Sequence, residues 1–193
     1  MEPVIVYCCR DRVDNVLELS DCGQENSIVR FKNLKIFTYG NNKTPSCFQR
    51  GASVEFPGYI TVSSGQIVVN ETLVLNNNAS LYFTLRKNDF FVNNVCKKGV
   101  SSHFAMPRRY CKPDLCTALG ADFCALIGNK GVHDLNTLQI SRQQFIRTDI
   151  SDPFAKLLLR GEWKGEIQLF YINDFVGCLA FPPNQRQWIR VNH

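Results

Sequence analysis

The sequence has no apolar stretch long enough to span a membrane and no concentrated run of basic residues. Lysine and arginine number 22 against 17 aspartates and glutamates, which gives a mild net charge of +5. The pairs Lys97-Lys98 and Arg108-Arg109 are typical of solvated loops. These absences exclude nucleic acid as an expected partner, whereas the mild positive charge favours anionic membranes or acidic partners. The run Val4–Tyr7 is too short for the apolar region of a signal peptide, so either a leader has been removed or these residues are its remnant.

The sequence also lacks the familiar catalytic motifs. It contains no G-x-S-x-G nucleophile motif, no H-E-x-x-H zinc motif and no glycine loop that cradles phosphate. His103 and His133 lie in a cysteine-rich segment, but a disulfide-bonded cysteine is no nucleophile, and no local signature supports a Cys–His pair. Acidic pairs such as Asp149 and Asp152 are ordinary in surface loops. We therefore expect no enzyme activity, no catalytic residue, no metal and no cofactor; a disulfide-rich hydrolase is the weakest alternative.

What the sequence does contain is nine cysteines in 193 residues, together with three N-x-[ST] sequons at Asn42, Asn70 and Asn78. The reducing cytosol does not favour this density of cysteine, and sequons matter only to chains that enter the secretory pathway. The length suits a single domain with enough aliphatic and aromatic residues for a core, which disulfides then reinforce. Together these features predict a secreted or endolysosomal glycoprotein.

Strand patterns separated by turn residues dominate the chain and predict an all-β sandwich or cup. In the run Gln66–Leu75, alternation places Asn70 on one face, where a glycan must meet water, and Val69 and Leu73 on the inward face. Glu71 shares the inward parity, which is costly unless it lies near a strand end or a bulge. The expected strands are Ser27–Phe37, Tyr59–Ser63, Gln66–Leu75, Ala79–Val92, Thr137–Phe145, Glu166–Ile172 and Val176–Phe181, with turns at Asn76–Asn78 and Asn173-Asp174.

One segment, Lys97–Val132, is irregular and rich in cysteine, and its stretch Pro113–Ile127 predicts a short helix opened by a Pro-Asp pair. A small helix tethered by disulfides in an all-β chain is typical of a functional loop or of a lid over an opening. The cysteine spacings C-x4-C and C-x7-C lack the paired C-x2-C of structural zinc sites, which argues against zinc. Because nine is odd, one cysteine is unpaired; pairing of Cys47 with Cys8 or with Cys9 stays open.

Two segments carry apolar side chains among cations and glycines. Three consecutive leucines in Phe154–Leu159 break strand alternation, and position alone favours a buried strand or helix turn. Pro153 before them, Gly161 and Gly165 after them, and the interleaved cations instead fit a loop that dips into a membrane interface. Phe104–Arg109 offers a second such tip. The expected membrane-contact residues are Phe104, Met106, Phe154, Leu157, Leu158, Leu159 and Trp163.

Several motifs, taken in order, resemble a known family. They are Asp21-Cys22, Pro57-Gly58-Tyr59-Ile60-Thr61-Val62, Val95-Cys96, Cys111-Lys112-Pro113-Asp114-Leu115-Cys116, Gly161-Glu162-Trp163-Lys164 and Val176-Gly177-Cys178-Leu179. Their order and the cysteine placement are similar to the ganglioside activator family, the non-enzymatic glycosphingolipid cofactors of lysosomes, within the wider ML-type lipid-recognition superfamily. The resemblance covers about Asp21 to Pro183, so the expected domain is 21–183, with an N-terminal extension at 1–20 and a C-terminal tail at 184–193.

The resemblance implies an immunoglobulin-like β-sandwich opened into a cup, with two sheets splayed apart over an apolar cavity. The bridges that it implies are Cys22–Cys178, Cys96–Cys111 and Cys116–Cys124. The first would close a loop of roughly 150 residues and contribute about 4–5 kcal/mol in the chain-entropy model. The chain departs from the family between Asp134 and Asp152, where later family cysteines are missing. The expected cavity lining is Ile67, Val69, Leu73, Leu75, Leu81, Phe83, Leu85, Ile167 and Leu169.

The function that the resemblance implies is lipid binding without covalent chemistry. The expected ligand is a glycosphingolipid, a phospholipid or a fatty acid, taken from a membrane during transient contact. The protein would then present the lipid to a hydrolase such as a glycosidase, or carry it to another membrane. The alternative is a secreted, disulfide-rich β-sandwich with a filled core that binds another protein as an adhesion or inhibitor module.

Overall fold

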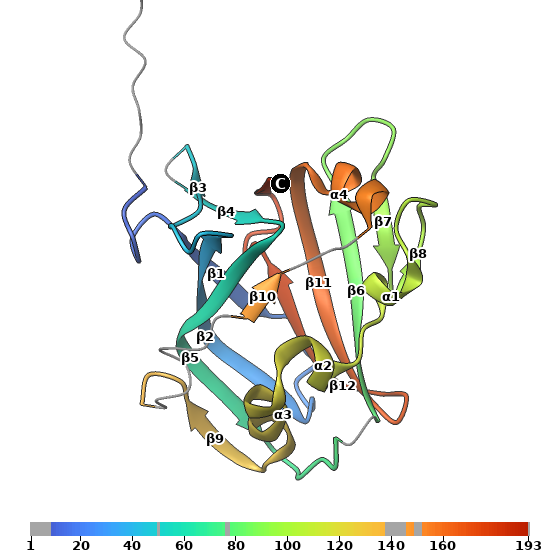
Figure 1. Ribbon diagram of the computed structural model, residues 1–193. Coiled ribbons are helices and arrows are strands. Elements are labelled where there is room, and N and C mark those ends of the chain that lie inside the picture. The colour runs from blue at the N-terminus through green and yellow to red at the C-terminus, as the bar shows by residue number, and fades with distance from the viewer. Residues whose placement is uncertain (1–8, 50, 76–77, 138–145, 149–151, 193) are drawn as a thin grey trace, which may run out of the picture.

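The computed structural model describes residues 9–49, 51–75, 78–137, 146–148 and 152–192, and it is mostly β (Figure 1). The strands are β1 (Val16–Asp21), β2 (Val29–Gly40), β3 (Cys47–Phe48), β4 (Gly51–Glu55), β5 (Gly58–Val69), β6 (Ala79–Lys87), β7 (Asn94–Lys97), β8 (Val100–Ser101), β9 (Gly131–Asp134), β10 (Ile146–Thr148), β11 (Gly161–Tyr171), β12 (Asp174–Phe181) and β13 (Ile189–Asn192). The helices are α1 (Arg108–Cys111), α2 (Leu115–Leu119), α3 (Ala121–Gly128) and α4 (Pro153–Leu159). A β-rich fold with small helical insertions agrees with the sequence-based expectation.

The strands join into one curled sheet, which we describe as two halves (Figure 1). The β2 half contains β5, β2 and the first part of β1, with β9 and β10 paired to β5. The β11 half contains β12, β11, β6 and β13 with their short neighbours. β1 connects the halves, because Leu19 lies opposite Leu34 on β2, whereas Ser20 lies opposite Ala180 on β12. Buried side chains of both halves pack into a shared cluster, so the halves face one another across the interior.

Strand β5 runs without interruption where two strands were expected. It includes Tyr59–Ser63 and the first part of Gln66–Leu75, and Gly65 between them has a φ of +117° at a register irregularity opposite β2. A Cβ at Gly65 would lie 2.7 Å from the Cα of Leu34. Glycine is therefore required there, both for the backbone angle and for the close approach of β2.

The inward and outward faces around the second sequon are as predicted. Asn70 is exposed, whereas Val69 and Leu73 are buried. Because β5 ends at Val69, Glu71 escapes the unfavourable inward parity and is exposed. The other two sequon asparagines, Asn42 and Asn78, are exposed as well.

Other element boundaries differ from the expectation by a few residues. Strand β6 ends at Lys87 instead of Val92. The hairpin between β11 and β12 turns at Ile172 and Asn173, whose φ angles of 47° and 72° are those of a type I′ turn, one residue earlier than predicted. Residues 138–145 of the expected strand Thr137–Phe145, and residues 76–77 of the expected turn, lie outside the described residues.

The helices correct two further expectations. The single helix expected at Pro113–Ile127 is two helices, because Gly120 between α2 and α3 has a φ of +85°. The segment expected to be a membrane-dipping loop forms helix α4. Asp152 caps α4 by accepting hydrogen bonds from the backbone N–H groups of Phe154 and Ala155, both at 3.0 Å, and proline occupies the first helical position.

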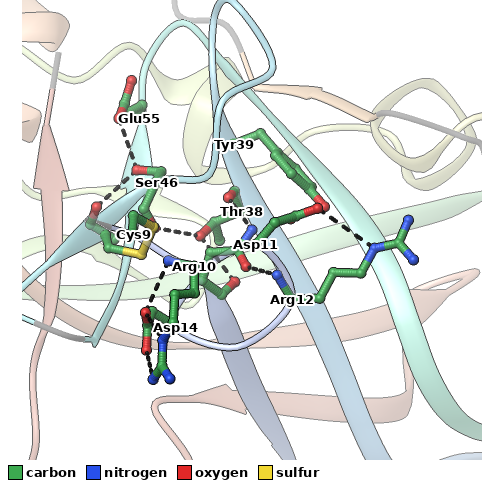
Figure 2. Close-up of a disulfide and its surroundings, with 12 residues drawn as sticks. Cys9, Arg10, Asp11, Arg12, Asp14, Thr38, Tyr39, Ser46 and Glu55 are labelled. Atoms are coloured by element: carbon green, nitrogen blue, oxygen red, sulfur yellow. Dashed lines mark hydrogen bonds and ion pairs between the residues drawn. A yellow bond between two sulfur atoms is a disulfide. The ribbon is translucent and has the colours of Figure 1, made fainter.

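Strands of the sheet also lie on both sides of the expected domain, 21–183. β1 begins at Val16, and β13, which follows residue 183, pairs with β11 and with β4. The segment before β1 is also anchored, since the Tyr39 hydroxyl donates a hydrogen bond to Asp11 Oδ1 at 3.0 Å (Figure 2).

Four disulfide bridges hold these elements together. The three bridges that the family resemblance implied, Cys22–Cys178, Cys96–Cys111 and Cys116–Cys124, are all present. The fourth joins Cys9 to Cys47 and resolves the choice that the sequence left open (Figure 2). Eight of the nine cysteines are therefore paired, and Cys8 lies outside the described residues.

Candidate functional site

Among the described residues, the buried apolar side chains form two clusters instead of one continuous core. The main cluster joins the two halves of the sheet to α2 and α3, with members such as Val29, Leu81 and Phe123. The second cluster, which we call the α4 cluster, lies where α4 packs on the beginning of β11 (Figure 1). Its members are Val95, Cys96, Met106, Cys111, Ala155, Leu158, Leu159, Trp163 and Val191.

A row of inward-facing side chains between the clusters is only partly buried. Phe83 on β6, Ile167 on β11 and Leu179 on β12 are direct cross-strand neighbours, and we call them the inner row. All three pack against the main cluster, and Phe83 also contacts the α4 cluster. Because β11 has a strand on each side, a filled sandwich would bury Ile167 fully, yet it keeps partial exposure.

The next inward-facing position on β11 toward α4 is a glycine and has no side chain. Gly165 lies between Leu85 on β6 and Phe181 on β12. A Cβ at Gly165 would lie 2.9 Å from Leu85 Cδ2 and 3.1 Å from Phe181 Cζ, so both side chains fold over the glycine. Both are partly exposed. Accessible apolar surface therefore continues from the inner row toward the α4 end.

At the end of the interior away from α4, the backbones of the two halves of the sheet approach each other closely. A Cβ at Gly177 on β12 would lie 2.8 Å from the carbonyl oxygen of Val29 on β2 and 3.1 Å from its Cβ. Leu115, Phe123 and Ile127 from α2 and α3 are buried against the same cluster. The interior is thus tightly packed at this end, whereas the inner row between the two clusters keeps partial exposure.

The nine side chains expected to line a cavity all point into this interior, but they divide into two groups. Phe83, Leu85 and Ile167 are partly exposed and line its accessible part. The other six are buried in the main cluster: Ile67, Val69, Leu73, Leu75, Leu81 and Leu169. Sequence reasoning missed Leu179 and Phe181, although parity within the expected strand Val176–Phe181 places both on one face.

Only three of the seven expected membrane-contact side chains are exposed: Phe104, Phe154 and Leu157. The expectation is wrong for Met106, Leu158, Leu159 and Trp163, which are buried in the α4 cluster. For Leu158 and Leu159 the reason is the helical period of α4, which turns these two side chains inward and Leu157 to solvent. The Trp163 indole lies against α4 and donates a hydrogen bond from Nε1 to the Leu159 carbonyl at 2.5 Å.

Two exposed aromatic residues near α4 were not predicted from the sequence. Phe90 and Phe91, in the loop between β6 and β7, are 94% and 90% exposed. The loop lies beside α4 (Figure 1), and Asn88 fastens it to β11 with hydrogen bonds to the Glu162 carbonyl, at 2.9 Å, and carboxylate, at 2.6 Å. A sequence signal existed, since an aromatic pair stands between Asn88-Asp89 and Asn93-Asn94, which are turn-forming residues. We call Phe90, Phe91, Phe154 and Leu157 the apolar rim.

Asp89 holds the aromatic pair in place. Its carboxylate accepts hydrogen bonds from the backbone N–H of Phe91 at 2.9 Å and of Val92 at 3.3 Å. The bond from Phe91 is the main reason that the pKa of Asp89 lies below its ordinary value. The carboxylate therefore stays ionised, and its turn stays intact, under mildly acidic conditions.

Comparisons with known proteins leave the geometry as the guide to function. No protein-family model matches the chain, and no curated protein is significantly similar to it. No helix among the described residues is both long and apolar enough to cross a bilayer. Over the same part of the chain, no three His, Cys, Asp or Glu side chains gather as metal ligands would.

Proposed function

We propose that the protein binds the apolar chain of a lipid between the two halves of its sheet, which form an immunoglobulin-like sandwich opened into a cup. The observation that carries the proposal is the partial exposure of the inner row at the centre of the β11 half. The inner row lies where a filled sandwich has its densest packing. Accessible Phe83, Ile167 and Leu179 side chains offer an apolar ligand the contacts that a filled core would use for itself.

The physical need for such a site is large. A 16-carbon chain drawn bare into water loses about 13 kcal/mol, at about 0.8 kcal/mol per CH₂ group. An apolar interior replaces the bilayer as solvent for the chain, and no covalent step is required. The protein would present the bound glycosphingolipid, phospholipid or fatty acid to a hydrolase, or carry it to another membrane.

The apolar rim supports uptake at a membrane surface. Phe90 and Phe91 are almost fully exposed, and Phe154 and Leu157 are each 68% exposed on α4, next to the exposed Arg160. Exposed apolar side chains beside cations suit a membrane interface, where the chains enter the boundary and the cations meet lipid phosphates. Four disulfides and three exposed sequon asparagines fit an extracellular or lysosomal compartment.

The test is to fill the interior. Ile167→Trp adds volume at the inner row, and Glu166→Trp places the same residue one position away on the opposite face of β11. A fluorescent fatty acid should bind the wild type and the Glu166→Trp control at a stoichiometric ratio. Ile167→Trp should bind it at least about ten-fold more weakly while keeping its melting temperature, because the new side chain takes the place of the ligand.

A filled core gives the opposite result. Overpacking costs about 1–3 kcal/mol, so Ile167→Trp would then lower the melting temperature and the wild type would bind no fatty acid. Leu179→Phe is a smaller insertion at the same row and decides the question if Ile167→Trp does not fold. A wild type that binds no fatty acid, together with an inserted side chain that lowers the melting temperature, would favour the protein-binding module over the lipid carrier.

A further inference from the structure

The wall of the sheet is split where β1 leaves β2. The two strands pair from Val16 to Leu19, and from Ser20 onward β1 pairs with β12 instead. On the other side of the split, Asn33 in β2 has a φ of +51° and the register of β2 against β5 is irregular. A pocket of about 830 Å³ occupies the space between the strands. We call this pocket the lateral slit; residues 18–21 of β1, residues 31–35 of β2 and Pro183 line it.

The lateral slit has an apolar inner side. Phe31 and Leu34 belong to the main cluster, and Leu19 packs against it while staying partly exposed. Glu18 and Lys32 are exposed and lie at the outer side. The pocket therefore touches both exposed charged and buried apolar side chains, and its volume falls in the range of small-molecule sites.

Of the charged side chains around the lateral slit, one cation has no ion-pair partner among the described residues. Lys35 pairs with Glu18 at 2.7 Å, and Arg30 pairs with Asp21 at 2.7 Å. Asp21 also accepts the Phe31 N–H at 2.8 Å, a backbone group that β1 no longer pairs. The described residues give Lys32 no carboxylate partner within ion-pair distance. An ammonium group therefore stands free at the mouth of a slit with an apolar inner side.

We propose that the lateral slit binds the anionic head group of an acyl amphiphile, a carboxylate or a phosphate, with its chain passing beside the last β1–β2 pair, Leu19 and Leu34, through the split into the interior. Lys32 supplies the charge and the Asn33 amide supplies neutral hydrogen bonds. This inference rests on the proposed function, because the chain needs the accessible interior as its destination. It places the head group at the side wall, away from the apolar rim.

The experiment compares Lys32→Glu with Lys97→Glu, the same charge change on β7, which the strand order separates from the lateral slit. The ligands are oleate, a monoacyl phosphate, uncharged oleyl alcohol and inorganic phosphate. Lys32→Glu should weaken oleate and the monoacyl phosphate by about ten-fold, the effect of one hydrogen bond to a charged group. It should leave oleyl alcohol unchanged, Lys97→Glu should change none of them, and inorganic phosphate should bind far more weakly than the acyl ligands.

The two proposals fail in different ways. If wild-type protein binds neither oleate nor oleyl alcohol, the proposed function is wrong. If the wild type binds both, and Lys32→Glu binds oleate as tightly as Lys97→Glu does, only the lateral slit is refuted. Binding of inorganic phosphate as tight as that of the monoacyl phosphate would show a simple anion site and would also refute it.

Discussion

Two neighbouring leucines on α4 should respond to the same substitution in opposite ways. Leu157 is 68% exposed and belongs to the apolar rim, whereas Leu158 is 8% exposed and belongs to the α4 cluster. Leu157→Ala should weaken binding to anionic vesicles without affecting the fold. Leu158→Ala should destabilise the fold without a specific effect on vesicle binding. Alanine suits a helix at both positions, so propensity does not confuse the comparison.

The expected changes in unfolding free energy and in vesicle binding follow from how deeply each leucine is buried. Truncating a core leucine to alanine costs about 2–5 kcal/mol through lost burial and the cavity left behind. An exposed truncation changes stability by about 0.5 kcal/mol or less. Full transfer of a leucine side chain into an apolar phase is worth about 1.5–3 kcal/mol, so the exposed two-thirds of Leu157 is worth about 1–2 kcal/mol. Vesicle binding should therefore fall by about five- to thirty-fold.

Urea unfolding gives the stability of each variant, and co-sedimentation with anionic vesicles gives partitioning. Measurements at two salt concentrations separate the apolar contribution from the charge contribution, which salt screens. Equal unfolding midpoints for the two variants would show that α4 does not pack as described. Unchanged partitioning of Leu157→Ala would show that the apolar rim does not meet the membrane.

Three further outcomes follow from the bridges and the titrating groups. Replacing Cys22 and Cys178 by alanine should lower the free energy of unfolding in urea by about 5 kcal/mol, because the bridge closes a separation of 156 residues. Replacing Cys116 and Cys124, at a separation of 8, should lower it by about 2.5 kcal/mol. The reverse order would contradict the chain-entropy explanation. Burial, and then the hydrogen bond to Asp11, raises the pKa of Tyr39, so its contribution to stability is complete below the ordinary tyrosine pKa of about 10 and is lost as the pH rises through the raised value. Alkaline unfolding should therefore lose one component in Tyr39→Phe, and identical pH profiles would refute this role. The pKa of Asp89 is lowered, so the turn that it caps is stabilised above the ordinary aspartate pKa of about 3.9 and loosens only as the pH falls through the lower value; an NMR midpoint at or above 3.9 would contradict the hydrogen bond from Phe91.

Most of the β-structure follows from local pattern. Asn70 had to face water and Val69 the interior because alternation in a strand has a fixed period of two, and the structure agrees. Elements that depend on a partner strand were harder to predict. β1 and β13 are too short and too polar to stand out, and they exist because β2, β11 and β12 offer pairing edges.

Helix α4 carries two sequence signals that point in different directions, a cluster of leucines and a capping pair. Asp152-Pro153 is a helix start signal that was present in the sequence. A run of three leucines on a helix must divide between faces, so it could never be exposed as a unit. The partial exposure of the inner row and the opening of the lateral slit could not be predicted, because both depend on how far apart the two halves of the sheet stand.

The disulfide between β1 and β12 links the fold to the lateral slit. Past Leu19, β1 could continue along β2 and close the wall. The Cys22–Cys178 bridge prevents this, since it fixes the end of β1 to β12, and the Cys22 N–H adds a hydrogen bond to the Cys178 carbonyl at 3.1 Å. Asp21 then accepts the hydrogen bond from Phe31 that a continuing β1 backbone would otherwise take. The bridge that the chain-entropy model expects to contribute most to stability thus also keeps the end of β1 away from β2 beside Lys32, so a site at the lateral slit would not compete with stability in this fold.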